Sequence, residues 1–387
     1  MVLIMKGIKS YIIAYFLPLY FILFSCVRQF DPEFTEYEDI LVVDGVITNE
    51  LIPHTITLSR SYPLDKKNPL PEIGAEVYLE DENGKTWKLI EFTGGIYKTD
   101  TNEFKAEIGE RYKLHITARN GEIFESDYAD LLAVPEIDSV TWKYQDRVSI
   151  YDGSVTQGVE FYLNTHNPQG TTRYYKWEFF ETWEFRVPFV AENMLPNRTT
   201  CWKDENPEGI YIGSSEFLAE DGFTNHPLYF ITGTTNRLAI AYSLQIKQYA
   251  LLKESYNYWD QLKKLNYQQG SLYDSPPAQM PGNIRNLTHP EKPVLGYFQA
   301  SGVTTRRIFI LRNQLPLDFY ITGGFSSCSI LEVPEAEAGS YYKQGYVYVS
   351  KYYNTQLQRW LTVITNSISC VDCTVSGSNT KPSFWPI

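Results

Sequence analysis

Short runs of alternating apolar and polar residues, each ended by a turn, constrain the fold of this chain more than any other feature. Residues 76–91 alternate around the turn at Asn83-Gly84, and residues 112–118 alternate up to Asn120-Gly121. An Asn-Gly pair between alternating runs indicates a β-hairpin, because both residues tolerate positive φ. Short strands with turns about every 8–12 residues are typical of antiparallel β-sandwiches. Residues 40–134 are therefore predicted to form an N-terminal β-sandwich.

A second sandwich is predicted after Pro135, which restricts the residue before it to extended conformations and marks a junction. Strand patterns resume over residues 137–144, 159–164, 173–187, 295–299, 307–311 and 346–352. The chain has 15% aromatic residues, including 30 Tyr, and aromatic side chains favour half-buried pleated surfaces. Residues 135–387 are therefore expected to form a larger, second β-sandwich domain.

One helix is predicted within this second domain, near residues 246–268. Apolar residues recur there at a spacing of three or four: Tyr249, Leu252, Tyr256, Trp259 and Leu262. The predicted fold class is therefore mostly β, with tandem antiparallel sandwiches and one inserted helix.

The first 25 residues have the pattern of a secretory signal peptide. Lys6 and Lys9 precede an apolar run that ends at Phe24, and Ser25 is a small residue before Cys26. The run is about 14 residues long, whereas a membrane-spanning helix needs about 20. A cysteine directly after the cleavage site resembles the lipid acceptor of a bacterial lipoprotein. Residues 1–25 are therefore predicted to be removed, Cys26 to carry a lipid, and residues 26–39 to form an acidic tether; a transmembrane anchor is the alternative.

The net charge of -12 argues against nucleic acid as a partner, because nucleic-acid binding needs a basic surface. Without Lys6 and Lys9 the mature chain has 32 basic and 46 acidic residues, a net charge of -14. Such a chain has no electrostatic attraction to anionic lipid, so membrane attachment is expected through the N-terminal lipid alone.

The remaining four cysteines are expected to form two disulfides, as is usual in exported proteins. They allow three connectivities, of which we favour Cys201–Cys328 and Cys370–Cys373. The alternative is a zinc site that uses Cys370 and Cys373 as one half. No second close pair of Cys or His accompanies them in the sequence, so we predict no metal.

The most suggestive segment for ligand binding is the aromatic run over residues 173–187. Strand alternation places Trp177, Glu181 and Trp183 on one face, where aromatic rings could stack on a ligand and Glu181 could contact it. The structural alternative is a core strand whose carboxylate is neutralised by an arginine or lies at the margin of the sheet. Glu178 and Glu184 lie on the other face, about 20 Å apart along the strand, too far for a pair of glycosidase carboxylates.

No catalytic constellation or cofactor motif is recognisable in the sequence. The five histidines have neither metal-site nor triad spacing, and no glycine-rich phosphate loop or Gly-x-Ser-x-Gly turn occurs. We therefore predict no catalytic residues and no cofactor.

Several segments together resemble an uncharacterised lipoprotein family of the Bacteroidota, domain-of-unknown-function family 4249. They are residues 41–50, 57–61, 135–140, 248–251, 258–259, 281–284, 296–298, 370–373 and 381–385. Residues 74–97 also resemble a transthyretin-like sandwich, which makes the expected fold tandem immunoglobulin-like or transthyretin-like sandwiches. Family members are typically encoded beside TonB-dependent outer-membrane transporters, so the resemblance implies such a partner and an outer-membrane location.

The expected function is that of a non-enzymatic outer-membrane lipoprotein, exposed at the cell surface or on the periplasmic face. It would bind a ligand for a TonB-dependent transporter or assist that transporter. The alternatives are a surface hydrolase of glycan or peptide, with Glu181 as the suspected carboxylate, and a structural envelope protein.

Overall fold

The computed structural model describes residues 39–61, 69–148, 153–170, 172–193, 195–268, 280, 282–317, 319 and 324–386. The predicted signal peptide (1–25), the lipid acceptor Cys26 and the tether, apart from Asp39, lie outside these residues. None of the helices in the described part of the chain combines the length and the apolar composition that crossing a membrane requires.

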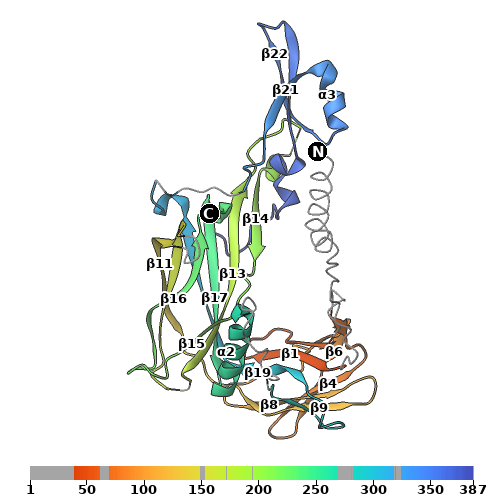
Figure 1. The fold of residues 1–387 in the computed structure, drawn as a ribbon, viewed down its shortest axis with the longest axis vertical. Helices are drawn as coiled ribbons and strands as arrows, with labels where there is room; N and C mark the ends of the chain where they lie inside the picture. Colours follow the sequence, from red (N-terminus) through yellow and green to blue (C-terminus); the bar gives the residue numbers. More distant parts are fainter. Residues whose placement is uncertain are drawn as a thin grey trace, which may run out of the picture. The chain divides into compact units, whose positions relative to one another are not determined.

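The first sandwich consists of two mainly antiparallel sheets, as the sequence predicted (Figure 1). One sheet has the order β19-β1-β2-β7-β6, with β3 paired to β2. Its strands are β1 (Leu41–Thr48), β2 (Thr55–Arg60), β3 (Leu70–Pro71), β6 (Ile90–Thr93), β7 (Ile96–Lys98) and β19 (Leu295–Ser301). Alternate residues of β1 and β2, such as Val43 and Leu58, are buried in the core, and those between them face outward.

The other sheet of the first sandwich has the order β18-β9-β8-β4-β5, with β10 paired to β8. Its strands are β4 (Glu76–Asp81), β5 (Thr86–Lys88), β8 (Arg111–Thr117), β9 (Ile123–Ser126), β10 (Ala129–Asp130) and β18 (Ile284–Asn286). Both predicted hairpins are present, since β4 pairs with β5 and β8 with β9. The glycines of the two Asn-Gly turns, Gly84 and Gly121, have positive φ, which explains why the turns use them.

Two strands from late in the chain complete the first sandwich. The sequence assigned residues 135–387 to the second domain, but β18 pairs with β9, and β19 pairs in parallel with β1. The cyan strands of this segment lie among the red and orange strands in Figure 1. Gly296 makes the parallel approach possible: its φ is +99°, and a Cβ there would lie 1.8 Å from the Val43 carbonyl oxygen. Parallel pairing between distant strands leaves no local sequence pattern, so the prediction missed it.

The second sandwich also consists of two antiparallel sheets, with the orders β11-β12-β16 and β14-β13-β17-β20; β15 pairs with β13. The strands are β11 (Ile137–Val148), β12 (Val155–His166), β13 (Tyr174–Arg186), β14 (Thr200–Glu205), β15 (Tyr211–Ser214), β16 (Gly222–Thr232), β17 (Ala241–Leu251) and β20 (Val303–Leu311). Large side chains from both sheets, including Phe161, Trp177 and Tyr242, share one core.

The predicted helix begins later than the sequence suggested. Residues 246–251 belong to β17, and α2 spans Lys253–Gln268. Strand β17 lies between β13 and β20, so both of its edges are paired, and its burial is almost continuous. Tyr249 of β17 and Leu252 extend the three- and four-residue spacing of the apolar residues in α2, which is why this prediction was wrong over 246–252.

A third, smaller sheet has the order β21-β23-β22 and carries helix α3 on one face. Its elements are β21 (Ile330–Pro334), α3 (Glu335–Tyr342), β22 (Val347–Asn354) and β23 (Arg359–Thr365). The tail then makes two short 3-10 turns, Ile368–Cys370 and Cys373–Val375.

The disulfides are Cys201–Cys373 and Cys328–Cys370, so the pairing we favoured from the sequence was wrong. The two 3-10 turns direct the cysteines of the Cys-x-x-Cys segment to different partners: Cys373 reaches β14 at the edge of the second core, and Cys370 reaches Cys328. Both disulfides consume the thiolates that the zinc alternative would have required.

Candidate functional site

The three residues proposed from the sequence as ligand contacts lie in the second core. Trp177, Glu181 and Trp183 are 1%, 1% and 3% exposed. The indole N–H of Trp177 donates to Gln248 Oε1 at 2.9 Å. The Glu181 carboxylate accepts a hydrogen bond from the Tyr242 hydroxyl at 2.7 Å and lies 3.1 Å from Arg237 Nη1. These residues therefore stabilise the core and are not the ligand contacts that the sequence suggested.

The electrostatics of Glu181 agree with this structural role. Burial raises the pKa of its carboxyl, although the Tyr242 hydroxyl and the charge of Arg237 oppose the rise. Arg237 also pairs with Glu205 at 2.6 Å, and its guanidinium lies 5.1 Å from the centre of the Trp183 ring. A substrate in solution would therefore meet the arginine and its partners before it met Glu181.

The opposite face of β13 carries the charged residues that line a groove. Across the β13–β17 pair, Lys176 lies opposite Tyr249, and Glu178 lies opposite Lys247. Glu178 accepts from Lys176 Nζ at 2.9 Å through one oxygen and from the Tyr249 hydroxyl at 2.5 Å through the other. Alternation along both strands thus sets four polar side chains in a block on the outer face of the sheet.

This block forms one wall of a groove of about 360 Å³ between the two sandwiches. The facing wall comes from β1, β2 and the loop between them, through residues such as Asp44, Thr48 and His54. Trp259 of α2 closes one side, and Lys176 Nζ lies 4.1 Å from the centre of its ring. A concave site of this size between two domains is a common place for a small ligand.

The charges in the groove are closely paired. Lys247 Nζ lies 2.5 Å from Glu50 Oε2, an ion pair that joins the second sandwich to the β1–β2 loop of the first. Burial alone would raise the pKa of Glu178, but the charge of Lys176 and the Tyr249 hydroxyl outweigh it, so the pKa lies below its usual value. Glu178 is therefore ionised at neutral pH and held by its two neighbours.

His54 lies beneath the groove with its ring against Phe104, at a centroid distance of 5.7 Å. It is 3% exposed, and its Nε2 atom has no hydrogen-bond partner in the described part of the chain. Burial lowers the pKa of His54 from 6.5 to about 4, although nearby Glu50 opposes the shift. The imidazole is therefore neutral at pH 7.

Acidification is expected to destabilise the protein through His54. The unfolded chain takes up a proton near pH 6.5 and the folded chain only near pH 4, so stability is full above 6.5 and falls as the pH drops towards 4. The loss should reach about 3 kcal/mol in the free energy of unfolding. Urea unfolding of the wild type and of His54→Asn at pH 7 and pH 4.5 checks this. Equal losses in the two proteins would show that His54 does not contribute.

The model of a family described as a domain of unknown function (DUF4249) matches residues 27–307. The chain belongs to this family. No curated protein matches the sequence. The DUF4249 match covers every residue of the groove and both sandwiches up to β20, and it confirms the family that the sequence motifs suggested. The description of DUF4249 assigns no activity, so a function has to be argued from the groove itself.

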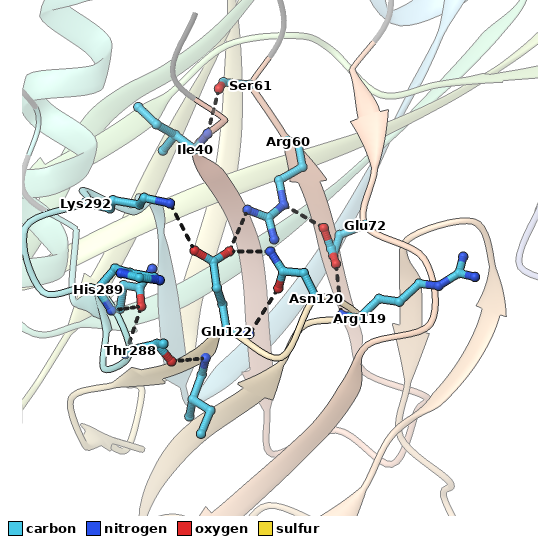
Figure 2. Close-up of polar contacts among 12 residues, drawn as sticks. Ile40, Arg60, Ser61, Glu72, Arg119, Asn120, Glu122, Thr288, His289 and Lys292 are labelled. Atoms are coloured by element: carbon cyan, nitrogen blue, oxygen red, sulfur yellow. Dashed lines mark hydrogen bonds and ion pairs between the residues drawn. The ribbon is translucent and has the colours of Figure 1, made fainter.

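A second charged cluster of this DUF4249 chain lies in the first sandwich (Figure 2). Figure 2 shows the Arg60 side chain between two carboxylates: Nε lies 2.6 Å from Glu72, and Nη1 lies 3.3 Å from Glu122. Glu122 also accepts from Asn120 at 2.7 Å and pairs with Lys292 at 3.4 Å. The Asn120 hydrogen bond and the two cations lower the pKa of Glu122 although burial opposes them.

This Arg60 cluster has a structural role. The side chains of Arg60, Glu72 and Glu122 are 9–10% exposed, and each carboxylate has a protein partner. Lys292 brings the segment after β18 to the β8–β9 turn, and Thr288 supports it by accepting from the Ile123 backbone N–H at 2.9 Å. The cluster therefore fixes the late segment to the first sandwich.

The sequence did not predict the groove, because its aromatic residues favoured the other face of β13 as the ligand-binding face. The same alternation that grouped Trp177 with Glu181 also placed Lys176 and Glu178 together on the other face. The second wall of the groove comes from β1 and β2, which are distant in the sequence, so no local pattern could predict it. Within the described residues, no group of three or more His, Cys, Asp or Glu side chains is arranged to hold a metal ion.

Proposed function

We propose that this protein is a non-enzymatic, lipid-anchored protein of the outer membrane that binds a small ligand in the groove. It would act there as an accessory to a TonB-dependent transporter. The groove between the two sandwiches carries the ligand-binding part of this proposal, since it is concave, partly aromatic and rich in polar groups.

The state of the charged groups favours binding over catalysis. General acid–base catalysis is efficient when the catalytic group has a pKa near the working pH. Glu178 has a lowered pKa, and both of its oxygens accept hydrogen bonds from the protein. His54 has a pKa of about 4 and its Nε2 atom is buried. These groups are suited to holding a ligand by fixed charges and hydrogen bonds.

The anchor and the location are supported by the N-terminal sequence. The basic residues, the short apolar run and Ser25-Cys26 match a lipoprotein signal, and the mature chain is too acidic to be drawn to anionic lipid. The implied transporter rests on the family resemblance of the motif residues.

Affinity purification from native outer membranes tests this proposal. The tagged wild type should incorporate labelled palmitate, fractionate with the outer membrane and retain a TonB-dependent transporter after mild detergent extraction. The Cys26→Ala variant removes only the lipid acceptor, so it should lose the label and the membrane association while its folded body remains intact.

Two results would contradict the proposal. Palmitate labelling that persists in Cys26→Ala would contradict the assignment of Cys26 as the lipid acceptor. If the wild-type protein is recovered from the membrane without any TonB-dependent transporter, the proposed accessory role is wrong.

A further inference from the structure

We infer that the groove binds a neutral, polyhydroxylated ligand with the chemistry of a mono- or disaccharide. This inference rests on the proposed ligand-binding function and names the class of ligand. It follows from the balance of charge in the groove, from the hydrogen-bonding capacity left on its side chains, and from its apolar surface.

Both lysines of the groove are already neutralised by protein carboxylates. Lys176 pairs with Glu178 and Lys247 with Glu50, His54 is neutral at pH 7, and the remaining carboxylate, Asp44, is exposed to solvent. An anionic ligand would find no free cation among the described residues of the groove and would leave its charge uncompensated in a site whose floor is buried, which costs free energy. A neutral ligand avoids that cost.

The two lysines retain donors for a ligand. The ammonium of Lys176 has three N–H donors, but in the described part of the chain it makes one hydrogen bond, to Glu178, although its residue is only 8% exposed. Lys247 is likewise held by Glu50. A ligand carboxylate would have to compete with these two glutamates, whereas a hydroxyl oxygen can accept from a spare N–H and leave both ion pairs intact.

The facing wall offers an acceptor. Asp44 is exposed on β1, and its side chain makes neither a hydrogen bond nor an ion pair within the described residues. A hydroxyl group both donates and accepts, so neighbouring hydroxyls of one ligand can accept from a lysine and donate to Asp44. Thr48, Thr55 and Thr57 add further hydroxyls to this wall.

The apolar part of the groove suits the C–H faces of a sugar ring. Trp259, Val46, Ile52 and Pro53 line it together. The Trp259 indole is fixed in place, because its N–H donates to Gln299 Oε1 at 2.9 Å and Lys176 lies over its ring. A flat apolar surface beside paired polar groups orients a ligand that has one C–H face and a polar rim.

A binding assay with defined saccharides tests this inference. The full mature chain, solubilised in detergent, is applied to an array of neutral mono- and disaccharides, the corresponding uronic acids and amino sugars, and dipeptides, and the binders are quantified by calorimetry. We expect neutral saccharides to bind. Asp44→Ala and Trp259→Ala should each weaken binding about tenfold or more, the effect of one lost interaction of about 1.4 kcal/mol.

The control variant is Lys88→Met, which removes an exposed lysine of the first sandwich outside the groove. It should bind as the wild type does, and all variants should keep the wild-type circular dichroism spectrum and melting midpoint. Asp44 is exposed, so Asp44→Ala provides a folded variant even if Trp259→Ala is unstable.

Preferential binding of charged sugars or dipeptides would overturn the inference, as would binding that Asp44→Ala leaves unchanged or an absence of saccharide binding. Those results concern only the ligand. Transporter recovery and palmitate labelling do not depend on the ligand. The binding assay can therefore contradict the ligand class without contradicting the accessory function, and the purification can contradict the accessory function without contradicting the ligand class.

Discussion

Removing the Cys201–Cys373 disulfide is expected to lower the free energy of unfolding of the second sandwich by about 5 kcal/mol. The two cysteines are 172 residues apart, and the loop that the bond closes restricts the unfolded chain more strongly as its length grows. The Cys201→Ala/Cys373→Ala double variant avoids a free thiol. Guanidinium unfolding followed by tryptophan fluorescence measures the change, since Trp177 and Trp183 report on this core.

The second disulfide is the matched control. Cys328 and Cys370 are 42 residues apart, so the corresponding double alanine variant should lose about 4 kcal/mol, and the loss should fall mainly on the tail and the β21–β23–β22 sheet. If the Cys328/Cys370 variant is the less stable of the two, loop length does not determine the effect. Mapping of disulfide-linked peptides would reveal the connectivity directly.

Arg60→Met is expected to destabilise the first sandwich by about 3–5 kcal/mol. The substitution keeps most of the apolar length of the side chain but leaves the Glu72 and Glu122 carboxylates buried without the guanidinium between them. Breaking a buried ion pair from one side is costly because the remaining charge has lost its compensation. Chemical denaturation monitored by circular dichroism measures the loss.

Two further variants separate this explanation from a simple packing defect. Adding Glu72→Gln and Glu122→Gln to Arg60→Met should recover part of the stability, because these changes remove the stranded charges. Lys88→Met breaks the Lys88–Glu76 pair, whose side chains are 56% and 60% exposed, and should leave the unfolding midpoint nearly unchanged. If Glu72→Gln and Glu122→Gln lower the stability of the Arg60→Met variant further, the uncompensated carboxylates are not the cause of its instability.

Local patterns in the sequence were sufficient for most strands and for both sandwiches. The hairpins at Asn83-Gly84 and Asn120-Gly121 depend on neighbouring residues, and the structure has them where the sequence placed them. The predicted start of α2 was too early because apolar residues at the end of β17 continue the spacing of the apolar residues in the helix.

The features that sequence reasoning missed all depend on contacts between distant residues. The disulfide partners of Cys370 and Cys373 are set by the two short turns of the tail, and the parallel pairing of β1 with β19 joins residues 42–48 to residues 295–301. The groove has the same origin, since Lys176 and Asp44 meet only after both sandwiches have formed. Trp177 and Glu181 were predicted as ligand contacts because an aromatic strand with a carboxylate has the same sequence pattern in a core as in a binding site.

The return of the chain to the first sandwich has a consequence for the order in which this protein can mature. Synthesis delivers residues 40–134 first, but β1 has no neighbour on one edge until residues 295–301 emerge and pair with it. An open strand edge is a template for pairing with other chains. The first sandwich is thus the first part of the folded body to be synthesised, but its sheet is completed only late. Residues 135–294 are synthesised while the edge of β1 is still exposed.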